Sequence, residues 1–445
     1  MSKYVIIGNG AAGVSAAEVI RRRDPQGDVT ILTEEKVRMY SRPGLAYLIN
    51  GQVSEEQVIT RTESFYEQHR LKLRYGPATH LDLQRRLVYL VSGESLPYDV
   101  VLMATGAGAV RPPFVGGDLD GVITFDNIAD AREVISRGRR AKSAVVVGGG
   151  ITAMELAEGL AHQRAKTHLL QRRNRIWEKL FDPQESAIIE EQMHHHGIKV
   201  HYDEEIEEIL GKGGKVAGVR LTSGAELPCQ IVGVAIGVRP NMGLVKALSL
   251  EQDRGILVNN HMQSSVPELF AAGDVAQVYD RWTQQHHLDV LWPSAINEGR
   301  AAGYNMVDVA RGKNPAYTYE KGSPFNAALL FGVHLTVIGQ ISGDRGENGD
   351  EGGAFFMSRG SSQVWTAPFR TGVRSAWDHE GPNSIRLATA EGRIIGALLM
   401  GNQELADPLR YLVNNEVDIS KREEQILRAD ADLPALVMQL YAEAR

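Results

Sequence analysis

The strongest constraint on the fold is a short glycine pattern that occurs twice, at residues 4–20 and again at 144–160. Each copy has a run of apolar residues, then Gly-x-Gly-x-x-Gly or Gly-x-Gly-x-x-Ala, then an alanine-rich stretch. The copies lie 140 residues apart, which is far longer than the period of a solenoid repeat. The repeat therefore predicts two β-α-β units, each built around a strand, a tight turn and a helix.

The three glycines of the first copy have different physical tasks. Gly8 permits a tight turn from strand to helix, and Gly10 removes a Cβ so that a pyrophosphate can approach the backbone. Gly13 lets the helix pack closely on the sheet. The helix N-terminus then offers free N–H groups to phosphate oxygens. Because each copy follows an apolar strand and opens a helix, each is a candidate dinucleotide site.

The end of the second strand of each unit is where a carboxylate would bind ribose hydroxyls. Glu34 and Glu35 stand there in the first unit, and a solvated acidic turn is the alternative interpretation. The second unit has Gln171 at this position, followed by Arg172 and Arg173. The missing acid and the added positive charge predict a second nucleotide site that is chemically different and could accept a 2′-phosphate.

Composition excludes several classes of protein. The 48 basic and 55 acidic residues give a net charge of −7, which argues against general binding to nucleic acid. The only cysteine is Cys229, which excludes an intrachain disulfide, a CxxC pair and a cysteine-held metal cluster. The N-terminus starts directly with a strand pattern, and apolar runs stay far below about 18 residues. We expect a soluble, cytoplasmic protein without a membrane span.

In these features the sequence resembles the FAD/NAD(P)-dependent pyridine nucleotide oxidoreductases, flavoproteins with two dinucleotide-binding domains. Four further segments match that family in its order: YDVVLMATGA (98–107), VAIGVRPN (234–241), ELFAAGDVAQV (268–278) and LWPSAINEGRAAGYNM (291–306). The resemblance implies FAD in the first unit and NAD(P)H in the second.

Within the family, YSRPGLAYLI (40–49) resembles a segment of rubredoxin reductases, nitrite reductase flavin modules and related NAD(P)H:acceptor reductases. By this resemblance Arg42 meets the pyrophosphate or the acceptor-side edge of the flavin, the alternative being a surface arginine. Tyr47 stands where several relatives have a lysine, and the redox-active cysteine of other relatives is absent from this region. Cys229 lies in an apolar strand pattern and is expected to be a buried core thiol.

The resemblance also assigns site residues. Asp274 would contact the ribityl chain, and Glu155 would approach the nicotinamide, or else be an exposed acid favoured by the helix dipole. Glu155 and Arg42 are therefore the candidate catalytic residues. The residues expected at FAD are Gly8, Gly10, Ala12, Gly13, Glu34, Glu35, Arg42, Pro43, Ala104, Thr105, Gly106, Gly273, Asp274, Pro293, Ser294 and Ala295. Those expected at NAD(P)H are Gly148, Gly150, Ile151, Glu155, Gln171, Arg172, Arg173 and Gly237.

The expected fold is α/β, with two Rossmann-like domains and a C-terminal α+β domain. The FAD domain would comprise residues 1–110 and 242–320, with the NAD(P) domain, 111–241, inserted in it. Residues 321–445 would form an α+β interface domain, in which the glycine-rich segment 343–353 reads as a polar loop. No metal site is expected, because the consecutive histidines 194–196 would point in different directions on a helix.

The expected reaction is hydride transfer from NAD(P)H to flavin N5, followed by electron transfer to an iron–sulfur or rubredoxin-like carrier protein. Alternatives are a flavin subunit of a larger redox complex of the nitrite reductase or oxoacid dehydrogenase type, an NADH oxidase, or a non-catalytic NAD(P)H sensor. The expected partners are the carrier protein or the subunits of such a complex, with no nucleic acid, and self-association into a homo-oligomer is left open. Both NADH and NADPH are expected to reduce the flavin, with a modest preference.

Overall fold

The computed structural model describes residues 1–445 except 179, 283, 342–372 and 381–382, so the predicted loop 343–353 lies outside the described residues. The described chain forms two compact units. One consists of Met1–Val110, Asp126–Ile128 and Val238–Lys321, and the other of Arg111–Phe125, Ala129–Gly237 and Gly322–Arg445.

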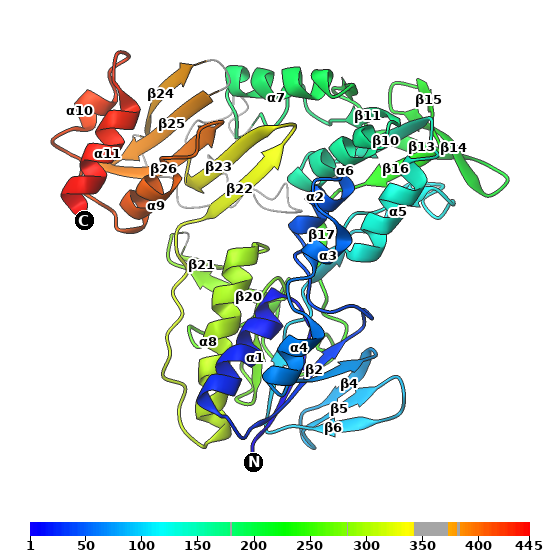
Figure 1. The fold of residues 1–445 in the computed structure, drawn as a ribbon, viewed down its shortest axis with the longest axis vertical. Helices are drawn as coiled ribbons and strands as arrows, with labels where there is room; N and C mark the ends of the chain where they lie inside the picture. Colours follow the sequence, from blue (N-terminus) through cyan, green and yellow to red (C-terminus); the bar gives the residue numbers. More distant parts are fainter. Residues whose placement is uncertain (179, 283, 342–372, 381–382) are drawn as a thin grey trace. The chain divides into compact units, whose positions relative to one another are not determined.

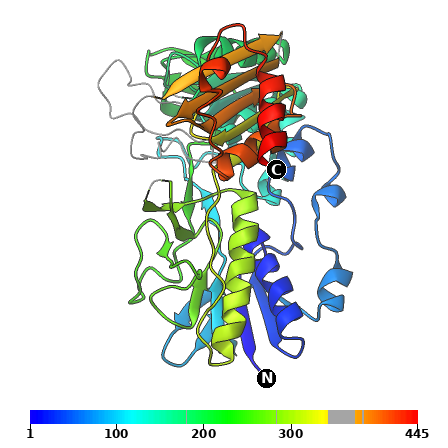
Figure 2. The same cartoon turned by 90° about the vertical axis from the view of Figure 1, so that its left-hand side faces the viewer.

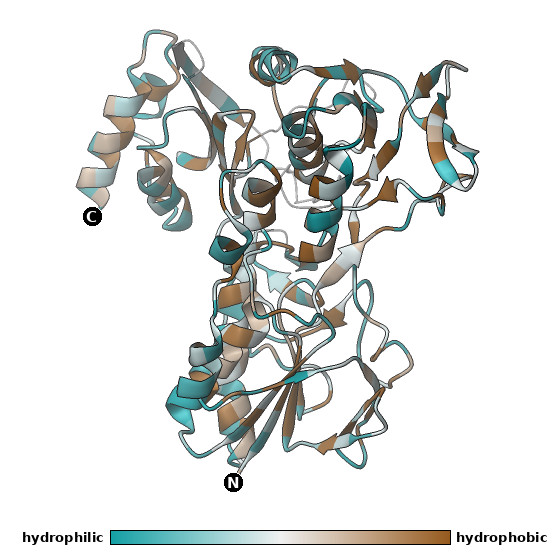
Figure 3. Cartoon of the chain, turned by 45° about the vertical axis from the view of Figure 1, so that its right-hand side comes forward, coloured by the Kyte–Doolittle hydropathy of each residue, from teal (hydrophilic) through white to brown (hydrophobic). Residues whose placement is uncertain are grey.

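The first unit is built on a five-stranded parallel sheet (Figure 1). Its spatial order is β19 (Leu269–Ala271), β7 (Val100–Met103), β1 (Lys3–Ile7), β2 (Asp28–Thr33) and β3 (Lys72–Tyr75). The central strands are apolar and almost fully buried, as is typical of parallel sheets covered on both faces. Figure 3 shows this hydrophobic colouring along the strands near the N-terminus.

Helices α1 (Ala11–Arg23) and α8 (Trp292–Ala310) lie side by side in the first unit (Figures 1 and 2). Small residues allow this approach, since a Cβ on Gly299 would lie 2.1 Å from the carbonyl oxygen of Ala12. At the other end of the pair, Arg23 forms an ion pair with Asp308 at 3.3 Å. The helix that follows the first glycine turn thus packs against a helix that begins about 280 residues later in the chain.

The remaining elements of the first unit are short. Three strands form an antiparallel sheet, two strands form an antiparallel ribbon, and three more strands form a small mixed sheet. In chain order the elements are α2 (Gly44–Ile49), α3 (Glu55–Val58), α4 (Glu63–Gln68), β4 (Ala78–Asp82), β5 (Leu87–Leu90), β6 (Ser95–Pro97), β8 (Ala107–Ala109), β17 (Val238–Pro240), β18 (Ile256–Leu257), β20 (Ala276–Asp280) and β21 (Gln285–Leu288).

The second unit contains another five-stranded parallel sheet, built from the second glycine repeat. Its order is β12 (Ile198–His201), β11 (Lys166–Leu170), β10 (Ser143–Val147), β16 (Ile231–Val234) and β9 (Val122–Ile123). Helices α5 (Ile128–Gly138), α6 (Ile151–His162) and α7 (Pro183–His195) connect these strands. An antiparallel sheet of β13 (Ile206–Lys212), β14 (Lys215–Leu221) and β15 (Glu226–Pro228) packs beside them.

The C-terminal part of the second unit has an antiparallel sheet of its own. The order is β22 (Phe325–Leu330), β23 (Val333–Gly339), β26 (Arg393–Met400), β25 (Asn383–Ala390) and β24 (Arg374–Glu380). Helices α9 (Ala406–Asn414), α10 (Glu423–Ile426) and α11 (Leu433–Ala444) follow the last strand and pack on it through a shared apolar core.

These sheets confirm the predicted fold class of two Rossmann-like parallel units and a C-terminal α+β part. The subdivision into an FAD domain, an NAD(P) domain and an interface domain stays a prediction. Among the helices that the structure describes, none combines the length and hydropathy needed to span a bilayer.

Candidate cofactor and nucleotide sites

The first glycine turn is fixed between the ends of two strands. Gly8 has φ +124°, and a Cβ there would lie 1.9 Å from the carbonyl oxygen of Ala104. The N–H of Gly8 donates to the carbonyl oxygen of Leu32 at 2.8 Å. Only glycine fits this position, because the backbone conformation and the space both exclude a side chain. Gly8 and Ala104, both expected in one site, are brought into contact.

The next glycine faces open space rather than protein. Apart from its chain neighbours, no heavy atom of the described residues lies within 4 Å of the point where a Cβ on Gly10 would be. Gly10 is the N-cap of α1, no described side chain caps the helix there, and the first turn holds no acidic residue. The N–H groups of this turn are thus available to an anion, and the cradle fits the pyrophosphate of a dinucleotide.

A second helix N-terminus meets the same turn. A Cβ on Gly273 would lie 3.2 Å from the Cβ of Ala12 in α1 and 3.6 Å from the Cβ of Ala295 in α8. Helix α8, whose first turn holds the expected site residues Pro293, Ser294 and Ala295, begins at Trp292 with no acidic residue in that turn. Because two positive helix ends converge beside Gly273, this end of the first unit favours an oxygen-rich anionic ligand.

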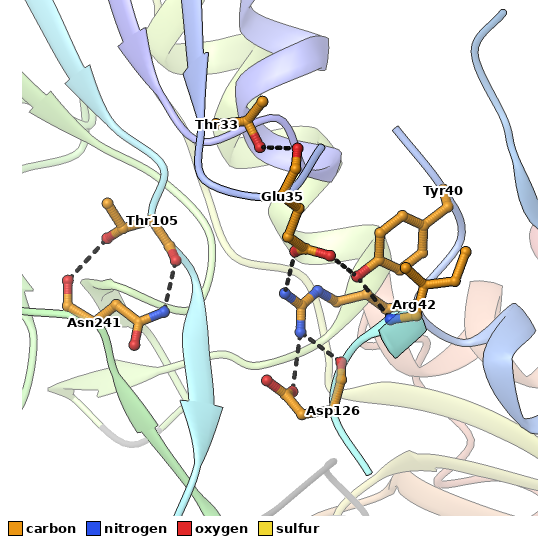
Figure 4. Close-up of polar contacts among 8 residues, drawn as sticks. Thr33, Glu35, Tyr40, Arg42, Thr105, Asp126 and Asn241 are labelled. Atoms are coloured by element: carbon orange, nitrogen blue, oxygen red, sulfur yellow. Dashed lines mark hydrogen bonds and ion pairs between the residues drawn. The ribbon is translucent and has the colours of Figure 1, made fainter. Parts of the chain in front are cut away.

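Arg42 lies in a network of acidic and phenolic groups (Figure 4). Its Nη1 donates to the carbonyl oxygen and the carboxylate of Asp126 at 2.7 and 2.9 Å, and its Nη2 lies 3.5 Å from Glu35. The Tyr40 hydroxyl donates to Glu35 at 2.7 Å. Burial lowers the pKa of Arg42, but Asp126, Tyr40 and Glu35 outweigh it, so the pKa is raised and the guanidinium stays charged.

The two acids that follow β2, Glu34 and Glu35, therefore have different surroundings. Glu35 is half-buried and turned toward Arg42, whereas Glu34 is exposed to solvent. Pro43, next to Arg42, is the N-cap of α2. The carboxylate of Asp274 acts electrostatically on Arg42, so these two expected site residues lie in one neighbourhood.

Two of the segments that match the family, 98–107 and 234–241, are paired with each other. Thr105 Oγ1 donates to the carbonyl oxygen of Asn241 at 3.0 Å, and Asn241 Nδ2 donates to the carbonyl oxygen of Thr105 at 2.9 Å (Figure 4). The N–H of Asn241 also donates to Gly106 at 2.9 Å. Strands β8 and β17 continue the pairing in antiparallel register, so the two segments are adjacent in the first unit.

The second glycine turn repeats the geometry of the first. Gly148 has φ +142°, and a Cβ there would lie 2.2 Å from the carbonyl oxygen of Ala235. Two side chains that follow β11 brace this turn from outside. Gln171, which is buried, donates from Nε2 to the carbonyl oxygen of Gly148 at 3.0 Å, and Trp177 donates to that of Gly149 at 2.6 Å. Trp177 was not predicted, because nothing in its local sequence marks it.

The other residues expected at the nucleotide surround this turn within the second unit. Gly150 is the N-cap of α6, Ile151 is its first residue, and Glu155 is half-buried on the next turn. Gly237 follows β16, next to the strand end that contacts Gly148. The two arginines that follow Gln171 lie at the surface: Arg172 is exposed, and the exposed Arg173 forms an ion pair with Glu178 at 2.8 Å.

Cys229 is fully buried in the core beside β16, as predicted. Burial raises the pKa of its thiol to about 12. A thiol that stays protonated and hidden from solvent is a poor nucleophile and a poor redox centre.

Sequence reasoning missed Glu298, which is buried on α8 and accepts a hydrogen bond from the N–H of Gly273 at 2.7 Å. The available signal was an acid set among the small residues of AINEGRAAG, which is unusual on a helix that packs closely. Asp126, the partner of Arg42, carried no such signal, because 84 residues separate the two.

Comparison with known proteins places this architecture. The sequence profile described as pyridine nucleotide-disulphide oxidoreductase matches residues 2–299. An NADH oxidase of Methanocaldococcus jannaschii is 30% identical over 317 residues, covering 69% of this chain and 70% of that protein. The rubredoxin-NAD(+) reductase of Ectopseudomonas oleovorans is 27% identical over 274 residues, covering 61% of this chain and 71% of the reductase.

A solved structure agrees over nearly the whole length. The crystal structure of a ferredoxin reductase from Rhodopseudomonas palustris superposes with a TM-score of 0.82 and 20% identity, covering 98% of this chain and 100% of that one. At this identity the likeness concerns the fold. Together, the matches confirm the predicted family, the enzyme class and the two cofactors. The chain belongs to the pyridine nucleotide-disulphide oxidoreductase family and is a flavin-dependent NAD(P)H oxidoreductase.

Proposed function

We propose that the enzyme passes electrons from NAD(P)H, by way of FAD, to an iron–sulfur or rubredoxin-like carrier protein. The observation that carries this proposal is the combination of two dinucleotide turns with a single, fully buried cysteine, Cys229. A disulfide within the chain cannot receive the electrons, so they must leave to an acceptor outside it. The similarity to a rubredoxin-NAD(+) reductase supports a small metalloprotein as that acceptor.

In this proposal FAD occupies the first unit, between the N-termini of α1 and α8. The glycine turn and Gly273 would hold the pyrophosphate, Asp274 the ribityl chain, and Glu34 or Glu35 the adenosine ribose. The full set is Gly8, Gly10, Ala12, Gly13, Glu34, Glu35, Arg42, Pro43, Ala104, Thr105, Gly106, Gly273, Asp274, Pro293, Ser294 and Ala295. The corresponding domain is residues 1–110 and 242–320.

NAD(P)H would bind at the second glycine turn, in residues 111–241. Gly148, Gly150 and Ile151 form the phosphate cradle, and Glu155 would face the nicotinamide. The rest of the nucleotide would be bordered by Gln171, Arg172, Arg173 and Gly237. Residues 321–445 would serve as the interface domain for the acceptor protein.

Bound FAD would supply the chemistry of taking up a hydride and releasing electrons singly. The protein's own contribution is position and electrostatics. The two helix N-termini stabilise negative charge on a bound ligand, and no described side chain is needed as an acid or base for the hydride. Arg42 stays charged between Glu35 and Asp126, which suits a residue that orients an anionic group.

The acceptor is tested by reducing the holoenzyme anaerobically with NADH and mixing it in a stopped-flow instrument. Three separate mixtures would contain oxidised rubredoxin, an oxidised [2Fe–2S] ferredoxin, or air-saturated buffer. We expect at least one carrier protein to reoxidise the flavin about tenfold or more faster than oxygen does, because an evolved acceptor docks specifically.

A second candidate is an NADH oxidase, the activity named for the Methanocaldococcus jannaschii relative. Oxygen that reoxidises the flavin faster than either carrier protein would favour that function and contradict the carrier proposal. Product analysis for hydrogen peroxide in the same mixtures would identify where the electrons went.

A further inference from the structure

Glu298 lies at a point where α8 packs directly on α1. The next residue, Gly299, touches the backbone of Ala12, and the Glu298 side chain is only 1% exposed. An ionised carboxylate in such a place costs several kcal/mol unless it is well paired. The contacts of Glu298 show that its pairing is incomplete.

Only one of its oxygens has a strong donor. Oε2 accepts from the N–H of Gly273 at 2.7 Å, whereas Oε1 has no hydrogen-bond partner among the residues that the structure describes. The nearby cation, Lys321, is already shared between Asp280 at 2.9 Å and Asp289 at 3.5 Å. Glu298 is thus an acid with one satisfied oxygen, beside a lysine that already pairs with two other carboxylates.

The surrounding charges favour the neutral form of this carboxyl. Burial, and after it the carboxylate of Asp289, raise the pKa of Glu298 well above its usual range. The Gly273 N–H and Lys321 act in the opposite direction but do not compensate, and Asp274 raises the pKa further. Burial, and after it the charges of Glu298, Asp289 and Asp280, raises the pKa of the nearby Tyr319, so it stays a neutral phenol.

The hydrogen bond from Gly273 to Glu298 holds a backbone turn that borders the proposed cofactor site. Gly273 has φ +76° and lies between Ala12 of α1 and Ala295 of α8, immediately before Asp274. The neighbouring N–H groups, of Ala272 and Ala276, are already bonded to other backbone carbonyls. The carboxyl of Glu298 is therefore the acceptor for the N–H of Gly273 in this turn.

We propose that Glu298 is a positioning residue for FAD: as a neutral acid it holds the Gly273–Asp274 turn in its binding conformation, and its ionisation loosens the turn and weakens FAD binding. Ionisation would favour the hydrogen bond from Gly273, but it would also place a buried negative charge beside Asp274 and Asp289, on a carboxyl whose Oε1 has no hydrogen-bond partner among the described residues. Either a shift of the turn or entry of water would relieve this. The inference rests on the proposed FAD site in the first unit.

The test measures FAD affinity of the apoprotein against pH, by the change in flavin fluorescence on binding, for wild type and Glu298→Gln. Glutamine keeps an oxygen for the Gly273 N–H but cannot ionise. We expect the wild-type Kd to rise by about tenfold or more between neutral and alkaline pH relative to Glu298→Gln. Glu67→Gln, which removes an exposed acid of the same unit, should follow the wild-type profile.

A second measurement needs no variant. After a jump of the wild-type holoenzyme from neutral to alkaline pH, FAD release should accelerate and reverse on return to neutral pH, with the circular dichroism of the fold unchanged. Parallel pH profiles for wild type and Glu298→Gln would overturn the positioning role of Glu298 alone. A wild-type apoprotein that binds no FAD at any pH would overturn the proposed site as well.

Discussion

Gln171 donates a hydrogen bond from Nε2 to the carbonyl oxygen of Gly148 at 3.0 Å, which joins the end of β11 to the second glycine turn. Gln171 stands where a ribose-binding acid is usual, but its side chain is hydrogen-bonded to the backbone of the glycine turn. In this chain, therefore, Gln171 braces the phosphate turn rather than being a neutral copy of a ribose-binding carboxylate.

This contact predicts the outcome of Gln171→Glu. A carboxylate oxygen would face the carbonyl oxygen of Gly148, so the turn should lose a hydrogen bond and gain a repulsion. We expect kcat/KM to fall for both NADH and NADPH, by an amount that corresponds to about 1–3 kcal/mol of transition-state stabilisation. Gln171→Met, of similar size and uncharged, should show a smaller loss. A selective gain for NADH in Gln171→Glu would contradict the bracing role.

The arginines after Gln171 should decide the use of NADPH. Arg173 is already paired with Glu178, so Arg172 is the better candidate for a 2′-phosphate. Arg172→Ala should cost NADPH about 1.5–3 kcal/mol in kcat/KM, as for a charge-assisted hydrogen bond, and leave NADH nearly unchanged. Arg173→Ala is the matched comparison and should have the smaller effect. Equal losses for both nucleotides would show that Arg172 serves a part common to the two.

Two glycines of the first turn should respond differently to substitution. Gly10 is extended and faces open space, so Gly10→Val should fold, keep its melting temperature as apoprotein, and lose most of its FAD because the side chain fills the phosphate cradle. Gly8→Ala should instead fail to fold normally, since its Cβ would collide with Ala104. The flavin-to-protein ratio and thermal unfolding measure the two effects. Full FAD retention in Gly10→Val would refute the site.

A buried ion pair predicts how the stability of the second unit depends on pH. Arg386 on β25 donates to Glu185 on α7 at 2.9 Å, and Glu185 is fully buried. Burial raises the pKa of Glu185 to about 7, although Arg386 and the N–H of Asp182 favour the charged form. The folded protein therefore binds the proton more tightly than the unfolded chain does, with its usual carboxyl pKa.

The contribution of Glu185 to stability is therefore complete at acidic pH, below the unfolded pKa, and is lost as pH rises through about 7. Denaturant unfolding at several pH values should show a fall of up to about 3 kcal/mol across this range that is absent in Glu185→Gln. A wild-type stability that rises with pH relative to the glutamine variant would contradict this assignment.

The local parts of the fold could be predicted from the sequence. The glycine turns were predictable because positive φ and the lack of space at Gly8 and Gly148 belong to a short strand-turn-helix pattern that is written in consecutive residues. The two parallel sheets follow from the apolar runs before those turns. The position of Cys229 in the core followed from its apolar strand pattern.

The contacts between distant segments could not be predicted. The motif at residues 40–49 predicted a functional role for Arg42. Its ion-pair partner, Asp126, lies in a segment with no recognisable motif. Glu34 and Glu35 are equivalent in the sequence, and only the packing of Tyr40 and Arg42 separates them. The burial of Glu298 could not be predicted, because it depends on the packing of α8 against α1.

We infer that FAD alone stores the electrons of NAD(P)H within this chain, with no thiol taking part. The most direct test is an anaerobic titration of the holoenzyme with NADH, followed by absorbance, and repeated after alkylation with a thiol reagent. We expect one equivalent of NADH per FAD to bleach the flavin completely and alkylation to change nothing, because Cys229 is the only cysteine and is fully buried. A requirement for two equivalents, or a loss of reduction after alkylation of folded protein, would contradict it.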